Sequence, residues 1–166
     1  MRKFLSILMV MLLARVAQGQ EIKSVKITDL EKTIAESKTP LLINFWASWC
    51  KPCIEEIPYF QDEVKAHNAS TGSPDSLQLL LVSLDFKEAF PKDIAAVAAK
   101  RKFTAPLLWL DETNADYFCP KVDPQWSGAI PASLFINNKT GYRKFFEQQL
   151  SPGQLKKEIM AILEIH

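Results

Sequence analysis

The chain has 166 residues, of which 48% are hydrophobic, and this is enough to bury one ordinary core without suggesting disorder or a second domain. It carries 20 basic and 19 acidic side chains. Such a balance argues against nucleic acid as a partner.

The first 19 residues differ from the rest in composition. Arg2 and Lys3 precede an apolar run from Phe4 to Ala14, and the small residues of Ala17-Gln18-Gly19 follow. This order is typical of a secretory signal peptide, and we expect residues 1–19 to be removed and residues 20–166 to form the mature domain. A membrane-spanning helix needs about 20 apolar residues, so we expect no stable membrane insertion after cleavage.

The first half of the domain has helix and strand signals in turn. Thr28-Asp29-Leu30-Glu31 reads as a capping box that opens a short helix ending near Pro40. Leu41 to Trp46 is an apolar run, as in a strand covered on both faces. A helix from about Cys53 to Asn68 follows, with Pro58 inside it.

The second half continues the alternation and ends in a hairpin and a helix. We expect strands or extended segments at three apolar runs, a helix between the first two, and a short helix after the second. In chain order these are Leu77 to Leu84, the helix Pro91 to Lys102, Leu107 to Leu110, a short helix within Asp111 to Tyr117, and Ala132 to Ile136. The turn Asn137 to Gly141 leads to Tyr142 to Phe146, and Ser151-Pro152-Gly153-Gln154 caps a final helix. The pattern predicts an α/β layer fold with a mixed sheet.

Cys50 and Cys53 stand at the expected start of the helix that follows the strand Leu41 to Trp46. Two cysteines at this spacing can form a disulfide, and a thiolate there faces the unpaired backbone N–H groups and positive end of the helix. In such sites the cysteine pKa falls from about 8.5 to roughly 3.5–7.5. We therefore predict a redox-active pair in which Cys50 attacks and Cys53 resolves.

Several neighbouring side chains are expected to tune this pair. Lys51 adds positive charge between the sulfurs and Pro52 fixes the first helical turn. Trp46 and Trp49 are expected to flank the disulfide and shield it from water, although core packing explains these aromatic residues equally well.

The segment from Asn44 to Cys53 and the later Trp126-Ser127-Gly128-Ala129-Ile130-Pro131 together resemble the thioredoxin superfamily. Glu56-Ile57-Pro58 after the second cysteine is similar to its TlpA/ResA-like branch. The resemblance covers Leu41 to the C-terminus and implies a thioredoxin-like three-layer α/β/α fold with an insertion before the cis-proline loop.

The resemblance also assigns roles away from the cysteines. It implies a cis bond before Pro131 and a backbone at Ile130 that binds an extended substrate segment. Asn44 departs from the buried aspartate of cytosolic thioredoxins, and an amide cannot act as that base. Glu56 is a candidate proton-handling substitute if it turns inward, and a solvated or structurally paired carboxylate is the alternative.

By this likeness the chain is expected to be an exported thiol–disulfide oxidoreductase of the periplasm or cell envelope. It would reduce disulfides of exported proteins, apocytochrome c among the candidates, with electrons from a membrane thiol transporter and without a cofactor. The same thiols could instead oxidise or isomerise disulfides, depending on their potential.

Two other classes of function compete with the enzyme. A metal site is disfavoured because closed zinc sites need four ligands, usually including a second pair besides the two cysteines. The histidines, His67 and His166, are not at a spacing typical of metal ligands. A non-catalytic thioredoxin-like binding module is disfavoured by two intact cysteines. The third cysteine, Cys119, is expected to be a buried free thiol, with a redox or intermolecular role as the alternative.

Overall fold

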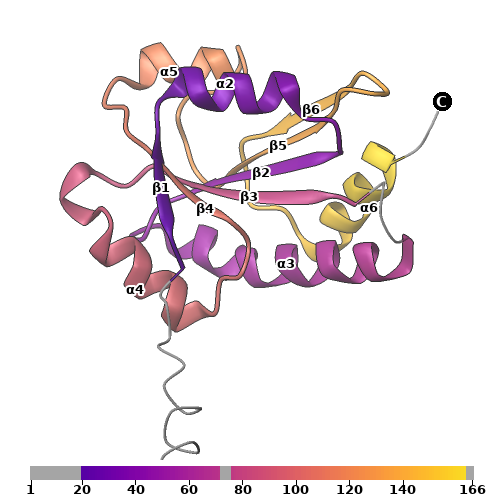
Figure 1. Cartoon of the computed structure of the whole chain (residues 1–166), viewed down its shortest axis with the longest axis horizontal. Coiled ribbons are helices and arrows are strands. Elements are labelled where there is room, and N and C mark those ends of the chain that lie inside the picture. Colours follow the sequence, from indigo (N-terminus) through magenta and orange to yellow (C-terminus); the bar gives the residue numbers. More distant parts are fainter. Residues whose placement is uncertain (1–19, 72–75, 164–166) are drawn as a thin grey trace, which may run out of the picture.

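The computed structural model describes residues 20–71 and 76–163, so the expected signal peptide, residues 1–19, lies outside the described residues. The six strands form one mixed sheet in the order β1-β4-β3-β2-β5-β6 (Figure 1). Strands β1 (Ile22–Val25), β4 (Leu107–Leu110), β3 (Gln78–Ser83) and β2 (Leu41–Trp46) run parallel. Strands β5 (Ala132–Asn137) and β6 (Tyr142–Phe146) run antiparallel to their neighbours.

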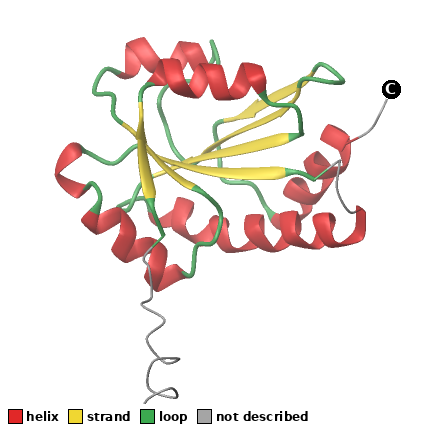
Figure 2. Cartoon of the chain, viewed as in Figure 1, coloured by secondary structure: helices red, strands yellow, loops and turns green. Residues whose placement is uncertain are grey.

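Helices cover both faces of the sheet and give three layers (Figure 2). On one face lie α2 (Ile27–Glu36) and α5 (Ala115–Val122), and on the other lie α3 (Lys51–Thr71), α4 (Lys92–Arg101) and α6 (Pro152–Leu163). A short 3-10 turn, η1 (Lys87–Ala89), joins β3 to α4. The predicted α/β/α fold is confirmed, and α5 lies in the segment between the cysteines and the proline loop.

Strand β2 is the centre of the fold because both of its faces are buried. Its side chains alternate between two cores, as period-two strand geometry requires. Leu42 and Trp46 pack with α3 and α6, whereas Ile43 and Phe45 pack with α2 and α5. The prediction of a fully covered strand at Leu41 to Trp46 is confirmed, since all six residues are buried.

The starts of two helices differ from the sequence prediction. Helix α2 begins at Ile27, not within Thr28 to Glu31, because Lys26 takes the N-cap position and its N–H donates to Asp29 Oδ2 at 3.0 Å. Helix α3 begins at Lys51, two residues before Cys53. Both helices therefore begin earlier in the chain than the sequence predicted. The final helix is capped as predicted, because Gln154 N–H donates to Ser151 Oγ at 3.3 Å.

Two features escaped the sequence analysis. Strand β1 is only four residues long and half exposed, so it carries no clear apolar pattern. The bond between Phe90 and Pro91 is cis, in addition to that between Ile130 and Pro131. Within residues 20–71 and 76–163, no helix is both long and apolar enough to cross a membrane.

Candidate active site

Cys50 and Cys53 form a disulfide at the N-terminus of α3, with their Cα atoms 5.3 Å apart. A turn places Cys50 there, because its N–H donates to the Ala47 carbonyl at 3.0 Å directly after β2. The N–H of Cys53 points at Cys50 Sγ at 3.3 Å. A backbone donor therefore lies on the first sulfur, which is the arrangement that stabilises a thiolate when the bond is reduced.

The two sulfur-bearing residues differ in access to solvent. Cys50 is 5% exposed and Cys53 is 0% exposed. Between them, the Lys51 ammonium lies 3.8 Å from Glu55 in an exposed i,i+4 ion pair, so part of its charge is directed away from the sulfurs. The Pro52 carbonyl accepts a hydrogen bond from Gln149 Nε2 at 3.3 Å, which ties the active-site turn to the segment before α6.

Glu56 turns inward, where it is fully buried under the sheet. Its carboxylate accepts hydrogen bonds from Asn44 Nδ2 at 2.8 Å and from the Leu150 N–H at 3.1 Å. Burial raises the pKa of Glu56 from 4.5 to about 7, against the lowering effect of the hydrogen bonds from Asn44 and Leu150. Asn44, which stands where the resemblance to cytosolic thioredoxins leads us to expect an aspartate, thus binds a carboxyl group brought in from α3.

The cis bond between Ile130 and Pro131 lies at the same end of β2 as the disulfide. Ala132, the residue after the proline, is the register partner of Phe45, and β2 ends one residue later at Trp46. Pro131 is buried, whereas Ile130 is partly exposed. The sheet therefore brings together the cysteine pair and the proline loop, which are about 80 positions apart in the sequence.

Glu147, just after β6, holds the loop that precedes Pro131. Its Oε1 accepts hydrogen bonds from the Ser127 N–H at 3.0 Å and the Ala129 N–H at 2.8 Å, and also from Ser127 Oγ. Burial opposes ionisation, but these hydrogen bonds outweigh it and hold the pKa of Glu147 below its ordinary value. This contact could not be predicted from the sequence, because a carboxylate after a strand is normally an exposed surface residue.

Asp85 is a buried carboxylate that the sequence analysis missed. It accepts hydrogen bonds from the Ser48 N–H at 2.9 Å and from Ser48 Oγ at 2.6 Å, two residues before Cys50. Ser83 Oγ donates to it at 2.7 Å, and its own carbonyl accepts from Trp109 Nε1 at 2.8 Å. Asp85 follows β3, and the carboxyl ends of parallel strands are where sites form in α/β sheets, so this position was the available signal.

The two tryptophans near the disulfide occupy different environments. Trp46 is fully buried and packs edge-on against Phe103, with ring centroids 5.3 Å apart. Trp49 is 61% exposed. Core packing therefore accounts for Trp46, and the expectation that the two rings shield the disulfide from water stays a prediction.

A cavity of about 560 Å³ opens between the turn that carries Trp49 and the loop that precedes Pro131. Trp49 and Ile130, the neighbours of Cys50 and of Pro131, both line it. Its other walls come from the end of β3 with η1, the end of β4 and the start of α5. Those walls are formed by Leu84, Asp85, Phe86, Lys87, Glu88, Trp109, Asp111, Glu112, Thr113, Ala115, Phe118 and Gly128. We call this cavity the disulfide pocket.

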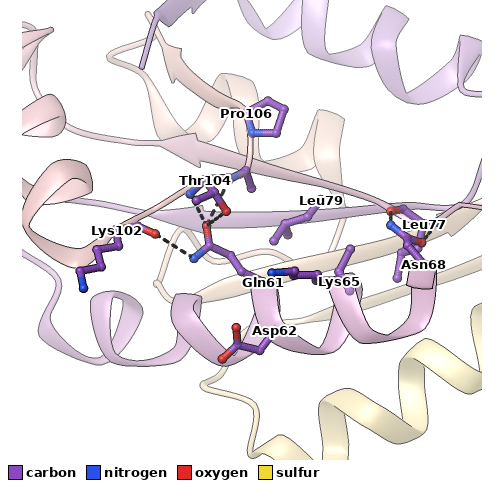
Figure 3. Close-up of a pocket in the computed structure, with 11 residues that line it drawn as sticks. Gln61, Asp62, Lys65, Asn68, Leu77, Leu79, Lys102, Thr104 and Pro106 are labelled. Carbon is purple, nitrogen blue, oxygen red and sulfur yellow. Dashed lines mark hydrogen bonds between the residues drawn. The ribbon is translucent and has the colours of Figure 1, made fainter. Parts of the chain in front are cut away.

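A second cavity of about 490 Å³ lies between α3 and the segment joining α4 to β4 (Figure 3). Gln61 crosses it, accepting hydrogen bonds from the Thr104 N–H at 2.5 Å and the Ala105 N–H at 3.1 Å. None of its lining residues is a sequence neighbour of Cys50, Cys53 or Pro131, and the Gln61 contacts fix the loop that enters β4. We assign it a structural role.

Cys119 on α5 is 3% exposed and is not disulfide-bonded. Burial, together with the charges of Glu147 and Asp116, raises the pKa of its thiol to about 11, so it is protonated at neutral pH. The prediction of a buried free thiol is confirmed. In the described part of the chain no three His, Cys, Asp or Glu side chains gather as metal ligands, and His166 lies outside that part.

Residues 14–141 match the AhpC/TSA family. Sporulation thiol-disulfide oxidoreductase A of Bacillus subtilis (strain 168) is 29% identical over 119 residues, which is 70% of this chain and 64% of that protein. Thiol-disulfide oxidoreductase ResA of Oceanobacillus iheyensis is 33% identical over 76 residues, which is 46% of this chain and 34% of that protein. The chain therefore spans less than two thirds of the length of these curated relatives.

Among solved structures, the crystal structure of StoA from Bacillus subtilis is similar to this chain with a TM-score of 0.56 and 27% identity. The similarity covers 76% of this chain and 86% of that structure. The ResA likeness inferred from Glu56-Ile57-Pro58 thus agrees with the relatives that the comparisons found.

Proposed function

The chain belongs to the AhpC/TSA family, and from that premise we propose that it is a thiol–disulfide oxidoreductase that works through Cys50 and Cys53. The observation that carries the proposal is the Cys50–Cys53 disulfide at a helix N-terminus, at the same end of the sheet as a cis-proline loop. The relatives named as thiol-disulfide oxidoreductases support it.

The reaction begins with both cysteines reduced. The Cys50 thiolate attacks one sulfur of a substrate disulfide, which breaks that S–S bond, forms a mixed disulfide and releases the other substrate sulfur as a thiolate that takes up a proton. Cys53, deprotonated, then attacks Cys50 Sγ and releases the second substrate thiol. Two electrons pass to the substrate, and Cys50 and Cys53 are left oxidised. Cys50 is assigned as the attacker because it is the more exposed of the two.

Glu56 is the group we propose to accept the proton of Cys53. It lies one turn further along α3, and its pKa of about 7 suits proton exchange near neutral pH. The alternative, a purely structural carboxyl group, accounts equally for the hydrogen bonds with Asn44 and Leu150. The two roles differ in what Glu56→Gln does to the pH profile of alkylation of Cys53, which only the proton-accepting role changes.

We propose that the protein is exported and acts as a reductase on disulfides of exported proteins. The composition of residues 1–19 supports export, and the ResA resemblance supports reduction and extends the candidates to the paired cysteines of apocytochrome c. Outside the cytoplasm the oxidised protein must be re-reduced, so the proposal includes a membrane thiol transporter as donor.

The first experiment measures reduction of insulin disulfides with dithiothreitol as the electron donor. The purified protein should accelerate the reduction, Cys50→Ser should be inert, and Cys53→Ser should accumulate a mixed disulfide with insulin because the resolving thiol is gone. A wild-type protein no faster than Cys50→Ser would overturn the proposed activity.

The direction of electron flow follows from the reduction potential of the pair. Equilibration with dithiothreitol or glutathione buffers, followed by tryptophan fluorescence, measures it. A value near or below about −250 mV supports a reductase, whereas a value near −120 mV indicates a disulfide-forming oxidase.

A further inference from the structure

The disulfide pocket combines a buried apolar floor with an exposed aromatic rim. Trp109 and Phe118 form part of the floor and are 5% and 7% exposed. Trp49 and Phe86 stand at the rim and are 61% and 72% exposed. Large aromatic side chains left exposed around an apolar cavity are typical of a surface that binds another molecule.

The floor is held rigidly, so the pocket exists before a partner arrives. The Trp109 ring stacks on Phe90 with centroids 4.3 Å apart, and its Nε1 donates to the Asp85 carbonyl at 2.8 Å. The Asp85 carboxylate in turn binds Ser48, beside Trp49. The same hydrogen-bonded group therefore fixes the floor of the pocket and the turn that carries Cys50.

The charged side chains that line the pocket are mostly acidic. The lining includes one basic residue, Lys87, and four acidic residues, which are Asp85, Glu88, Asp111 and Glu112. Three of these carboxylates already have contacts. Asp85 accepts from Ser48 and Ser83, Asp111 lies 2.9 Å from the Lys26 ammonium, and Glu112 accepts from the Ile27 N–H at 3.0 Å. Glu88 is the exposed carboxylate of the four. Even with Lys26 included, acidic groups exceed basic ones, which favours a cationic partner.

The position of the pocket relates it to the thiol chemistry. Ile130 lines it, and the backbone of that residue is the expected site of strand-like pairing with an extended substrate. In a substrate strand that pairs with Ile130 and has its cysteine sulfur at Cys50, successive side chains point to opposite sides. Residues one or two positions from the substrate cysteine are therefore the ones that reach the pocket.

We propose that the disulfide pocket selects substrates, receiving a bulky apolar side chain next to the attacked cysteine while its acidic rim favours an adjacent Lys or Arg. The inference rests on the proposed function, since it concerns the segment whose disulfide Cys50 attacks. The occupant is an extended polypeptide segment that carries a cysteine, a large apolar residue and a basic residue within a few positions.

The test uses short peptides joined as symmetrical disulfide dimers, so that both sulfurs are equivalent. Four versions combine Leu or Ala with Lys or Glu near the cysteine. Single-turnover oxidation of pre-reduced protein is followed by tryptophan fluorescence. Each rate is divided by the rate of the same protein with bis(2-hydroxyethyl) disulfide, a small neutral disulfide that has no side chain for the pocket.

We expect Leu to exceed Ala by about tenfold, from burial of the larger side chain. Lys should exceed Glu by about threefold at low salt, and this ratio should shrink at 0.5 M salt because the charges lie at an exposed rim. Phe86→Ser should reduce the Leu/Ala ratio and Glu88→Gln the Lys/Glu ratio. The matched controls, Met160→Ser on α6 and Glu36→Gln at the far end of α2, should keep both ratios.

The outcomes separate this inference from the proposed function. Equal normalised rates for all four peptides, with a rapid reaction of bis(2-hydroxyethyl) disulfide, would refute the pocket and leave the oxidoreductase intact. No reaction with any disulfide would refute the proposed function itself. A preference for Glu over Lys, or ratios unchanged in the Phe86→Ser and Glu88→Gln variants, would also overturn the inference.

Discussion

Glu56→Gln should change how the stability of the oxidised protein depends on pH. Burial raises the pKa of Glu56 from its ordinary 4.5 to about 7 in the folded protein. Between these two values the folded chain binds the proton and the unfolded chain has lost it. Stability therefore falls as the pH rises from about 4.5 to about 7, and the loss is complete above that range.

The size of the effect follows from the same shift. A change in pKa from 4.5 to about 7 corresponds to about 3 kcal/mol, because each tenfold change in proton affinity is worth about 1.4 kcal/mol. Glutamine stays neutral throughout and can still accept from the Leu150 N–H. The Asn44 Oδ1 atom has no hydrogen-bond partner within the described residues. It can accept from the amide N–H of the glutamine at position 56 if the Asn44 side-chain amide rotates by half a turn.

Urea unfolding of the oxidised protein, followed by tryptophan fluorescence at intervals from pH 4.5 to pH 8, measures this difference. The free energy of unfolding of Glu56→Gln relative to wild type should increase by about 3 kcal/mol across this range. Glu55→Gln, on the exposed side of the same helix, should run parallel to wild type. If the difference in unfolding free energy between Glu56→Gln and wild type stays constant with pH, the argument that ionisation of the buried Glu56 carboxyl group destabilises the fold is refuted.

Three further substitutions, Gly128→Ala, Glu147→Gln and Asp85→Ala, test the segments around the disulfide, and Gly153→Ala in α6 is a comparison for the first. Gly128 has a φ of +96°, so Gly128→Ala should destabilise the protein by about 1–2 kcal/mol. Gly153→Ala within α6 should instead stabilise it by about 0.5 kcal/mol, and thermal unfolding of both variants measures the two effects. Glu147→Gln should lower stability by about 1–2 kcal/mol at pH 7, and urea titrations should show the gap closing as the pH falls below the ordinary pKa of 4.5, because the wild-type carboxylate is then protonated. Asp85→Ala leaves the Ser48 N–H without its acceptor, and we expect a loss of about 1–3 kcal/mol together with faster amide hydrogen exchange at Ser48; unchanged exchange would contradict the anchoring role of this carboxylate.

The chemistry at the cysteines was predictable because it is local. A Cys-x-x-Cys pair after an apolar run places both sulfurs at a helix start whatever the rest of the chain does. The buried strand at Leu41 to Trp46 was predictable for the same reason, since a run of apolar residues interrupted only by Asn44 fits a covered strand. The cis bond before Pro131 came from resemblance, because composition alone favours a trans bond.

The surroundings of the disulfide depend on contacts between distant segments. Asp85 reaches Ser48 across 37 positions, and Glu56 accepts from the Leu150 N–H across 94. Neither carboxylate differs in sequence from an exposed one. Burial raises the pKa of Glu56, and the hydrogen bonds from Asn44 and Leu150 offset only part of this effect. The sequence by itself therefore determined the reactive pair and the layers of the fold through periodicity and helix-end chemistry. Only the tertiary structure decided which carboxylates are buried and which residues line the disulfide pocket. Those segments are distant in sequence, and the fold brings them together at the carboxyl ends of the parallel strands.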